Sequence, residues 1–350
     1  MKPFFSIIIP YHNSEATIGR LLRSIQKSKK APAYEVIVVD DGSTEPVTPA
    51  PFSVTPAQAG VQPKKILDSR FRGNDKMSLR VIRLSRNMGP AVARNRGVKI
   101  ARGKFVVFLD SDVELFPDAL HNLGKIYEDD PDVVAVTGVW VKEQRSKAFF
   151  PNYKALRDWS YWINERDKSG YYFLFSTRVA SIKKTVFQRL GGFDETYPAP
   201  LVEDIELTYR IARRYAIIFA PNVRVRHEFE SFWPVAKKYF LRAYYWTKLY
   251  ARRKKFDPVA TTLQEALTTI SGVAVVLCSF LVIIFPFILY SLFFILFFHL
   301  FLTRKFLAFM VREKGIVFTV KGFFMGLVLY CFIFAGAMAG RVFPLWSKVR

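Results

Sequence analysis

The feature that most constrains the fold is a long apolar run near the C-terminus. Residues Ala266 to Thr303 contain no Asp, Glu, Lys or Arg. As one helix, at ~1.5 Å per residue, this run would be about 57 Å long, nearly twice the ~30 Å hydrocarbon core of a bilayer. Pro286 lies inside the run, and proline suits a break between two helices. The sequence therefore predicts two membrane-spanning helices that meet near Pro286.

A second uncharged run extends from Gly322 to Gly340. As a helix it would be about 28 Å long, which fits one further span. We therefore predict a membrane region over residues 259–350 with two or three transmembrane helices. Two spans plus a re-entrant helix is an alternative, and a set of very hydrophobic core helices is another. A third span would place basic residues outside, against the positive-inside tendency: these are Arg341, Lys348 and Arg350.

Positive charge gathers beside the apolar runs. The chain has a formal net charge of +23, and its densest basic run, Lys248 to Lys255, precedes the first predicted span. Lys and Arg in this position are typical of cytoplasmic loops and also meet anionic lipid. No zinc-finger spacing or RNA-recognition aromatic motif accompanies the charge, so we expect membrane lipid and no nucleic acid as a partner. The prediction is a multi-pass protein of the inner (cytoplasmic) membrane, with its N-terminal domain facing the cytoplasm.

Residues 231–258 mix aromatic and basic side chains between the N-terminal domain and the membrane region. This pattern predicts an interfacial helix in the headgroup layer, with its aromatic side inward and its basic side toward lipid phosphates. An ordinary packed surface helix is the alternative. The aromatic residues are Trp233, Tyr239, Phe240, Tyr244, Tyr245, Trp246 and Tyr250.

Cysteine usage and the N-terminus agree with a reducing compartment. The two cysteines, Cys278 and Cys331, both lie in apolar stretches, so a disulfide framework is not expected. The apolar run within Met1 to Pro10 is too short for a signal peptide. We therefore expect the N-terminal domain to stay in the cytoplasm.

Residues 1–230 read as an α/β domain. Apolar strand-like runs alternate with helical spacing, which indicates a mostly parallel sheet with helices on both faces. Two acidic clusters, Asp40-Asp41 and Asp110-Ser111-Asp112, follow the ends of apolar strands. Ligands bind beyond the carboxyl ends of such strands. The predicted strands are Phe4–Ile9, Glu35–Val39, Leu79–Leu84 and Phe105–Leu109, and the predicted helices are Ser14–Ser28 and Pro90–Ala101.

Residues 46–78 interrupt this alternation. They are rich in proline and match no catalytic motif, and loops of this length are uncommon inside compact domains. Thr55 to Asp75 looks like a translated bacterial intergenic repeat. We expect a disordered insertion, which costs little closure entropy.

Two carboxylates one residue apart follow the buried run Val106 to Leu109. Placing Asp110 and Asp112 together is unfavourable unless a cation joins them, and carboxylate oxygens suit a hard divalent ion that also binds phosphates. The pattern predicts a metal site. An Asp-X-Asp triplet alone is a weak signal, because many loops contain one.

The order of motifs resembles the family 2 glycosyltransferases, inverting enzymes with the GT-A nucleotide-diphospho-sugar transferase fold. The resemblance covers residues 4 to about 230, less the insertion, which replaces the helix usually found after the second motif. It implies that Mg²⁺ or Mn²⁺ is the cofactor. The matching pieces are SIIIPYHN at Ser6 to Asn13, VVDDGST at Val38 to Thr44, NMGPAVARNRG at Asn87 to Gly97, FLDSD at Phe108 to Asp112, GGFDE at Gly191 to Glu195 and VED at Val202 to Asp204.

The resemblance implies roles for the nucleotide-binding and metal-binding residues. Asp41 would contact the base and ribose of the nucleotide, helped by Asp40 and by the turn formed by Pro10, Tyr11 and Asn13. The alternative for the two aspartates is a turn that satisfies backbone donors. Arg94 would meet phosphate or be a surface arginine. Asp112 would bind the metal directly, and Asp110 would support it and also contact the nucleotide-sugar. His227 would be a late metal ligand or a simple surface histidine.

Asp204 resembles the general base, which would take the proton from the attacking acceptor hydroxyl. The alternative is a helix N-cap, with Glu203 and Glu206 favourable in the first turn. The aromatic region Trp159 to Phe175 is expected to help bind the acceptor.

The resemblance predicts sugar transfer from a nucleotide-diphospho-sugar donor to a lipid-linked or membrane-proximal saccharide acceptor, with inversion, in cell-envelope polysaccharide or glycolipid synthesis. One alternative is a processive polysaccharide synthase. Those enzymes usually carry Gln-X-X-Arg-Trp, and this chain has only Arg242-Ala243-Tyr244-Tyr245-Trp246 near the membrane. Another is a non-catalytic membrane scaffold whose transferase domain is inactivated by the insertion.

Overall fold

The chain forms two compact units in a computed structural model that describes residues 2–45, 67–70, 77–165, 173–197, 201–256 and 262–342. Unit 1 comprises Met1–Val141 and Tyr171–Glu228, and unit 2 comprises Lys142–Gly170 and Phe229–Arg350. Phe229 is close to the domain end expected at residue 230. Unit 2 also takes in Lys142–Gly170, which the sequence pattern had assigned to the N-terminal domain.

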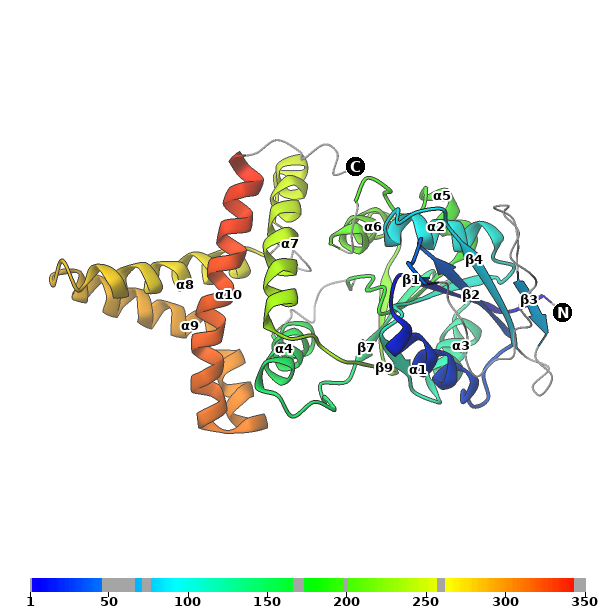
Figure 1. The fold of residues 1–350 in the computed structure, drawn as a ribbon, viewed down its shortest axis with the longest axis horizontal. Helices are drawn as coiled ribbons and strands as arrows, with labels where there is room; N and C mark the ends of the chain where they lie inside the picture. Colours follow the sequence, from blue (N-terminus) through cyan, green and yellow to red (C-terminus); the bar gives the residue numbers. More distant parts are fainter. Residues whose placement is uncertain are drawn as a thin grey trace. The chain divides into compact units, whose positions relative to one another are not determined.

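Unit 1 is built on a mixed sheet (Figure 1). Its strands are β1 (Phe5–Tyr11), β2 (Tyr34–Asp40), β3 (Leu67–Arg70), β4 (Met77–Arg83), β5 (Phe105–Leu109), β6 (Val113–Leu115), β7 (Ala135–Trp140), β8 (Val179–Lys183) and β9 (Ile217–His227). As far as the chain is described, their order is β3-β4-β2-β1-β5-β8-β7-β9-β6. The parallel sheet is confirmed for β4, β2, β1 and β5. Strands β3, β8 and β6 pair antiparallel with β4, β5 and β9.

The parallel strands form the core because helices cover both faces of the sheet. Figure 1 shows α1 (Glu15–Gln26) and α3 (Ala119–Asp129) on one face, and α2 (Pro90–Ile100), α5 (Lys184–Arg189) and α6 (Glu203–Ala212) on the other. Every residue of β2 and β5 is buried, as expected for strands covered on both sides. Helix α2 approaches β1 closely: a Cβ added at Gly97 would lie 2.5 Å from Ile8 Cγ2.

The predicted strands and helices of unit 1 occur within about two residues of their expected ends. The segment expected to be a disordered insertion, 46–78, falls mostly outside the described residues. Two parts of it are described, and they differ from the expectation: Leu67–Arg70 forms β3, and Met77 begins β4. The four residues of β3 pair in antiparallel register with β4, so backbone hydrogen bonding organises this part of the insertion.

Unit 2 is helical. Its elements are α4 (Phe149–Trp159), the π-helix η1 (Ser160–Asn164), α7 (Phe232–Arg253), α8 (Leu263–Leu281), α9 (Ile288–Lys314) and α10 (Ile316–Val342). Helix α4 belongs to this unit because Phe150, Tyr153 and Leu156 pack in one buried cluster with residues of α7, α9 and α10. The packing partners of α4 are distant in sequence, which explains why the local pattern did not reveal it.

Within residues 262–342 of the C-terminal region, three helices are long and apolar enough to cross a membrane: α8, α9 and α10. The predicted break near Pro286 is confirmed, because α8 ends at Leu281 and α9 begins at Ile288. Helices α8 and α9 lie side by side as a hairpin, and α7 lies alongside α10 (Figure 1). Helix α7, the segment expected in the headgroup layer, thus also packs against protein, with five of its residues buried.

Candidate active site

The carboxylate of Asp41 is fixed by backbone donors at the end of β2. Its two oxygens accept hydrogen bonds from the N–H groups of Met88 and Gly89, at 2.7 and 2.8 Å. The side chain is buried, and burial raises the pKa of this carboxyl. Asp41 therefore anchors the loop that leads into α2. The alternative interpretation, an aspartate that satisfies backbone donors, describes its contacts, and the predicted contact with base and ribose stays a prediction.

Asp40 is buried beside it and holds the following turn. Its Oδ1 accepts the N–H of Ser43 at 2.9 Å, and Arg83 Nε lies 3.6 Å from its Oδ2. Arg83 also donates to the carbonyl oxygen of Ser43 at 2.6 Å. Asp40 thus stabilises the turn that follows β2 through buried contacts.

The turn after β1 lies against the turn after β2. Tyr11 is buried, and its carbonyl accepts the N–H of Asp41 at 2.8 Å. Asn13 is exposed and adopts a left-handed φ of 46°, a region where asparagine is tolerated. Its N–H donates to Ser43 Oγ at 3.0 Å, and its side-chain oxygen accepts the N–H of Thr44 at 3.0 Å. The predicted nucleotide-binding residues Pro10, Tyr11, Asn13, Asp40 and Asp41 therefore form one joined edge of the sheet.

Arg94 is not a surface residue: it is 2% exposed and bridges two carboxylates. Its Nη1 lies 2.8 Å from Glu203 Oε1, and its Nη2 lies 2.7 Å from Asp110 Oδ1. Burial alone would lower the pKa of the guanidinium, and the charges of Asp110 and Glu203 more than offset that effect. Helix α2 thereby ties the end of β5 to the start of α6.

Glu203 is a site residue that sequence reasoning treated only as part of a helix first turn. It is buried, and its second oxygen accepts the N–H of Leu201 at 2.9 Å. Its position beside Asp204 in the VED motif is the signal that pointed to this region. The partnership with Arg94 spans 109 residues of sequence, so no local pattern predicts it.

Asp112 and His227 meet across an antiparallel strand pair. Strand β6 starts directly after Asp112, and its first residue, Val113, is in register with His227 of β9. His227 Nε2 lies 3.3 Å from Asp112 Oδ2, and the two side chains are 12% and 44% exposed. The fold thus brings together two side chains that the resemblance assigns to a metal, and their roles as metal ligands stay a prediction.

This pair fits a divalent ion as two of its ligands. Two neighbouring ligand atoms on an octahedral ion with bonds of ~2.1 Å lie about 3 Å apart, close to the spacing of Asp112 Oδ2 and His227 Nε2. Mg²⁺ and similar ions use few protein ligands and complete their shell with water and phosphate oxygens. Among the residues that the structure describes, no group of three or more His, Cys, Asp or Glu side chains is placed to hold a metal. Asp110, one of whose oxygens is paired with Arg94, is suited to a supporting role.

Asp204 is the second residue of α6 and not its N-cap, a position that Val202 occupies. Its Oδ1 accepts the N–H of Ile205 at 2.8 Å, and the residue is half-buried. The N-cap interpretation is therefore wrong, because the helix begins at Glu203, two residues before the start that an Asp204 N-cap requires. Through Glu203 and Arg94, the helix end that carries Asp204 is joined to Asp110.

The aromatic region predicted to bind acceptor, Trp159 to Phe175, divides between the two units. Trp159 stacks on Phe309 within unit 2, with ring centroids 5.4 Å apart. Phe175 is fully buried in unit 1. Residues 166–172 lie outside the described residues. The described ends of this region therefore serve packing.

Comparison with known proteins identifies relatives for part of the chain. It is 33% identical to the succinoglycan biosynthesis protein ExoO of Rhizobium meliloti (strain 1021) over 144 residues, which is 39% of this chain and 35% of ExoO. It is 37% identical over 110 residues to the poly(ribitol-phosphate) beta-N-acetylglucosaminyltransferase TarS of Staphylococcus aureus (strain Mu50), covering 31% of this chain and 16% of TarS. The matches span less than half the length of either relative.

Among solved structures, the fold is similar to the mannosyltransferase PcManGT from Pyrobaculum calidifontis, solved in complex with GDP-Man and Mn²⁺. The TM-score is 0.54 and the identity 18%, over 98% of this chain and 88% of that chain. At this identity the likeness shows the fold, and it bears out the expected GT-A architecture with C-terminal apolar helices. The sequence matches the profile of Glycosyl transferase family 2 over residues 6–52 and 62–190. With half of its residues in this match, the chain belongs to Glycosyl transferase family 2.

Proposed function

We propose that the chain transfers a sugar from a nucleotide-diphospho-sugar donor to a lipid-linked or other membrane-proximal saccharide acceptor, with inversion at the anomeric carbon. The observation that carries this proposal is the pairing of Asp112 Oδ2 with His227 Nε2 at 3.3 Å, just beyond the parallel strand β5. These two side chains would hold Mg²⁺ or Mn²⁺ together with oxygens of the donor diphosphate. When bound, the ion neutralises charge that builds on the departing diphosphate.

Asp204 is assigned the proton transfer. Its carboxylate accepts the proton of the acceptor hydroxyl while that oxygen bonds to the anomeric carbon, and the bond from that carbon to the diphosphate oxygen breaks on the opposite side. Arg94 acts as a positioning residue, because it holds both Asp110 and the helix start that carries Asp204. The turn with Pro10, Tyr11 and Asn13 would lie against the base and ribose, supported from within by Asp40 and Asp41.

The relatives support the same class of reaction. ExoO is named for succinoglycan biosynthesis and TarS for N-acetylglucosamine transfer, which favours a role in cell-envelope polysaccharide synthesis. PcManGT was solved with GDP-Man and Mn²⁺, which favours a nucleotide-sugar donor and a divalent ion. The basic residues of α7 support a membrane-bound protein whose catalytic unit faces the cytoplasm, where the headgroups are anionic.

Metal and nucleotide binding provide the first test. Isothermal titration of the full chain with UDP, GDP and dTDP, each with and without Mn²⁺, should show metal-dependent binding of one nucleotide. Asp112→Ala should abolish that binding. Asp118→Asn is the matched control, because this aspartate is half-exposed and its distance to Arg224, 3.8 Å, is long for an ion pair. Full binding by Asp112→Ala would remove the proposed metal site, and no binding to any nucleotide would favour a non-catalytic scaffold.

Sugar transfer tests the base. Asp204→Asn should bind metal and nucleotide normally and lose about 10²–10⁴-fold in transfer rate, the typical contribution of general base catalysis. A full transfer rate would show that another group takes the proton. The length of the product made by purified enzyme separates single addition from the processive alternative.

A further inference from the structure

The hairpin of α8 and α9 has an apolar tip. Residues 282–287, between the two helices, contain no polar or charged side chain. Ile283 is 80% exposed, Ile284 68% and Phe287 71%. A hairpin that crossed a bilayer would present its connecting loop to water or headgroups on the far side, where polar residues are expected. This tip is instead suited to hydrocarbon.

The backbone groups of the tip also form hydrogen bonds within the hairpin. The N–H groups of Val282, Ile283, Ile284 and Phe285 donate to carbonyls of Cys278, Phe280 and Leu281, and those of Ile288 and Leu289 donate to carbonyls of Phe285 and Pro286. An unpaired backbone group is costly inside a bilayer, which has no water to bond it. A turn with this much internal bonding meets that requirement.

The two arms do not exceed the thickness of the hydrocarbon core. The uncharged parts of α8 and α9, Ala266–Leu281 and Ile288–Thr303, have 16 residues each. At ~1.5 Å per residue each is about 24 Å long, against ~30 Å for the hydrocarbon core. The apolar residues 282–287 extend this reach, so the length of the hairpin allows its tip to end in the far part of the core.

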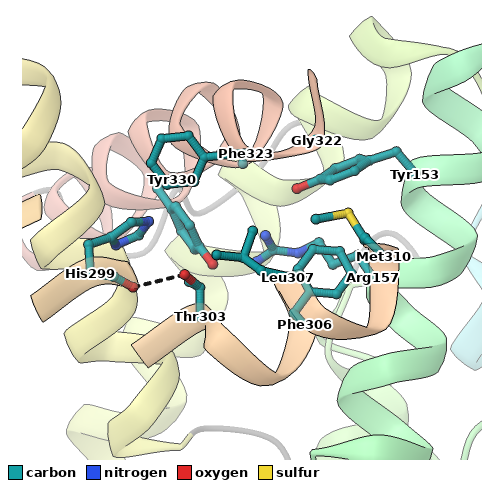
Figure 2. A pocket seen from close by; sticks show the side chains of 11 residues that line it. Tyr153, Arg157, His299, Thr303, Phe306, Leu307, Met310, Gly322, Phe323 and Tyr330 are labelled. Atoms are coloured by element: carbon teal, nitrogen blue, oxygen red, sulfur yellow. Dashed lines mark hydrogen bonds between the residues drawn. The ribbon is translucent and has the colours of Figure 1, made fainter. Parts of the chain in front are cut away.

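Polar contacts mark the base of the hairpin. His299 Nδ1 lies 2.9 Å from Ser271 Oγ, and Thr303 Oγ1 donates to the carbonyl of His299 at 2.8 Å. Arg157 of α4 pairs with Glu265 at 2.9 Å. Figure 2 shows Arg157, His299 and Thr303 around a small pocket. Its cavity of about 10 Å³ has room for about one water. The buried polar contacts and the ion pair of the hairpin thus lie away from its tip.

Helix α10 follows α7 in parallel and at close range. Phe332 contacts Phe232, a Cβ added at Gly336 would lie 2.1 Å from the carbonyl oxygen of Phe240, and one added at Gly340 would lie 2.6 Å from that of Tyr244. The two glycine contacts advance by four residues on both helices, about one turn, so the helices stay alongside each other over this stretch. Small residues four apart allow such close backbone approach.

Helix α7 determines the depth at which α10 lies in the membrane. It carries six basic residues in 22, and each Lys or Arg placed at the centre of a bilayer costs at least about 2.5 kcal/mol. Alongside α7, helix α10 lies at the interface as well. The most exposed apolar residues of α10 agree, because after its first residue, Ile316, they form one helical stripe: Val317, Val320, Phe324, Val328, Met338 and Val342.

From these contacts we infer that α8 and α9 form a re-entrant hairpin, which enters the acyl-chain region of a bilayer from one side and ends inside it, while α7 and α10 lie along the interface on the side of entry. The chain then binds the membrane without crossing it, and Arg341 stays on the same side as unit 1. This arrangement replaces the multi-pass expectation and removes the conflict with the positive-inside tendency. It rests on membrane binding and not on the chemistry of the active site.

Single-cysteine labelling tests the arrangement in the full chain. In a Cys278→Ser, Cys331→Ser background, one cysteine is placed at a time by Lys27→Cys in unit 1, Lys255→Cys before the hairpin, Arg341→Cys after α10, or Ile284→Cys at the tip. Phe287→Cys is a second tip position. Right-side-out and inside-out sealed vesicles are treated with a membrane-impermeant maleimide, with and without detergent.

The same side of the vesicle should label the cysteines that replace Lys27, Lys255 and Arg341. The tip cysteines should be labelled from neither side until detergent is added. Labelling of the tip from the side opposite to Lys27 would show a crossing hairpin and overturn the inference. Labelling of the tip from the Lys27 side would show that it is not inserted, and labelling of Arg341 from the far side would show that α10 crosses. None of these outcomes depends on sugar transfer, so failure here is distinct from failure of the proposed function.

Discussion

Replacing Arg94 by methionine tests the buried ion-pair cluster of unit 1. The guanidinium is 2% exposed and bonded to Glu203, which is 3% exposed, and to Asp110, which is 29% exposed. Methionine retains much of the apolar stem and removes the charge. Among the residues that the structure describes, the carboxylate of Glu203 is then left buried with the N–H of Leu201 as its donor.

The magnitude follows from the burial of Glu203. Removing one partner of a buried pair typically destabilises a protein by about 3–5 kcal/mol. In a domain of this size each 1 kcal/mol lowers Tm by about 2–4 °C, so Arg94→Met should lower the Tm of unit 1 by about 6–20 °C. Thermal unfolding of the detergent-solubilised full chain measures this change.

An exposed arginine provides the matched control. Arg20 is 42% exposed and lies 3.4 Å from Glu114, and an exposed pair of this kind contributes about 0–1 kcal/mol. Arg20→Met should therefore leave Tm almost unchanged. The double variant Arg94→Met, Glu203→Leu should recover part of the loss, because an apolar pair replaces the isolated charge. If Arg94→Met and Arg20→Met had the same Tm, the buried cluster would not contribute as described.

Three further predictions concern helix packing and the base of the hairpin. Gly97→Ala should destabilise unit 1 by about 1–3 kcal/mol, seen as a lower Tm, because the added Cβ would lie 2.5 Å from Ile8 Cγ2; an unchanged Tm would mean that α2 and β1 are farther apart. Gly336→Ile should separate α10 from α7 and expose α10 to limited proteolysis, whereas the exposed neighbour Ala335 should tolerate Ala335→Ile; equal cleavage of both variants would contradict this packing. Glu265→Ala leaves the half-buried Arg157 without its carboxylate partner at 2.9 Å and should lower the thermal stability of unit 2 by about 1–3 kcal/mol, while Glu265→Asp should recover part of it; no loss in Glu265→Ala would show that the pair is not maintained.

The sequence predicted those parts of the site that rest on short-range patterns. Four aspartates lie at the ends of apolar strands, and the carboxyl ends of parallel strands meet at one edge of the sheet: Asp40, Asp41, Asp110 and Asp112. The motif resemblance added His227, whose meeting with Asp112 depends on the pairing of β6 with β9. The partnership of Arg94 with Glu203 was not predictable, because 109 residues separate them in the sequence. The local sequence around a buried arginine also does not distinguish it from an exposed one.

Membrane architecture was predicted less completely for a similar reason. Hydropathy reports how apolar a helix is, and α10 is apolar enough to span. The packing of α10 against α7 depends on Gly336 and Gly340. The role of these glycines is evident only when the position of α7 is known. The assignment of α4 to unit 2 likewise depends on Phe150, Tyr153 and Leu156 finding partners on helices far along the chain.

The position of β3 has a consequence for truncated variants of this chain. β3 pairs with one side of β4 at the margin of the sheet. A variant shortened by removal of residues 46–76 would leave the seven-residue strand β4 with a row of unpaired backbone donors and acceptors. Unpaired strand margins recruit strands from other molecules. We therefore expect the shortened protein to self-associate through β4.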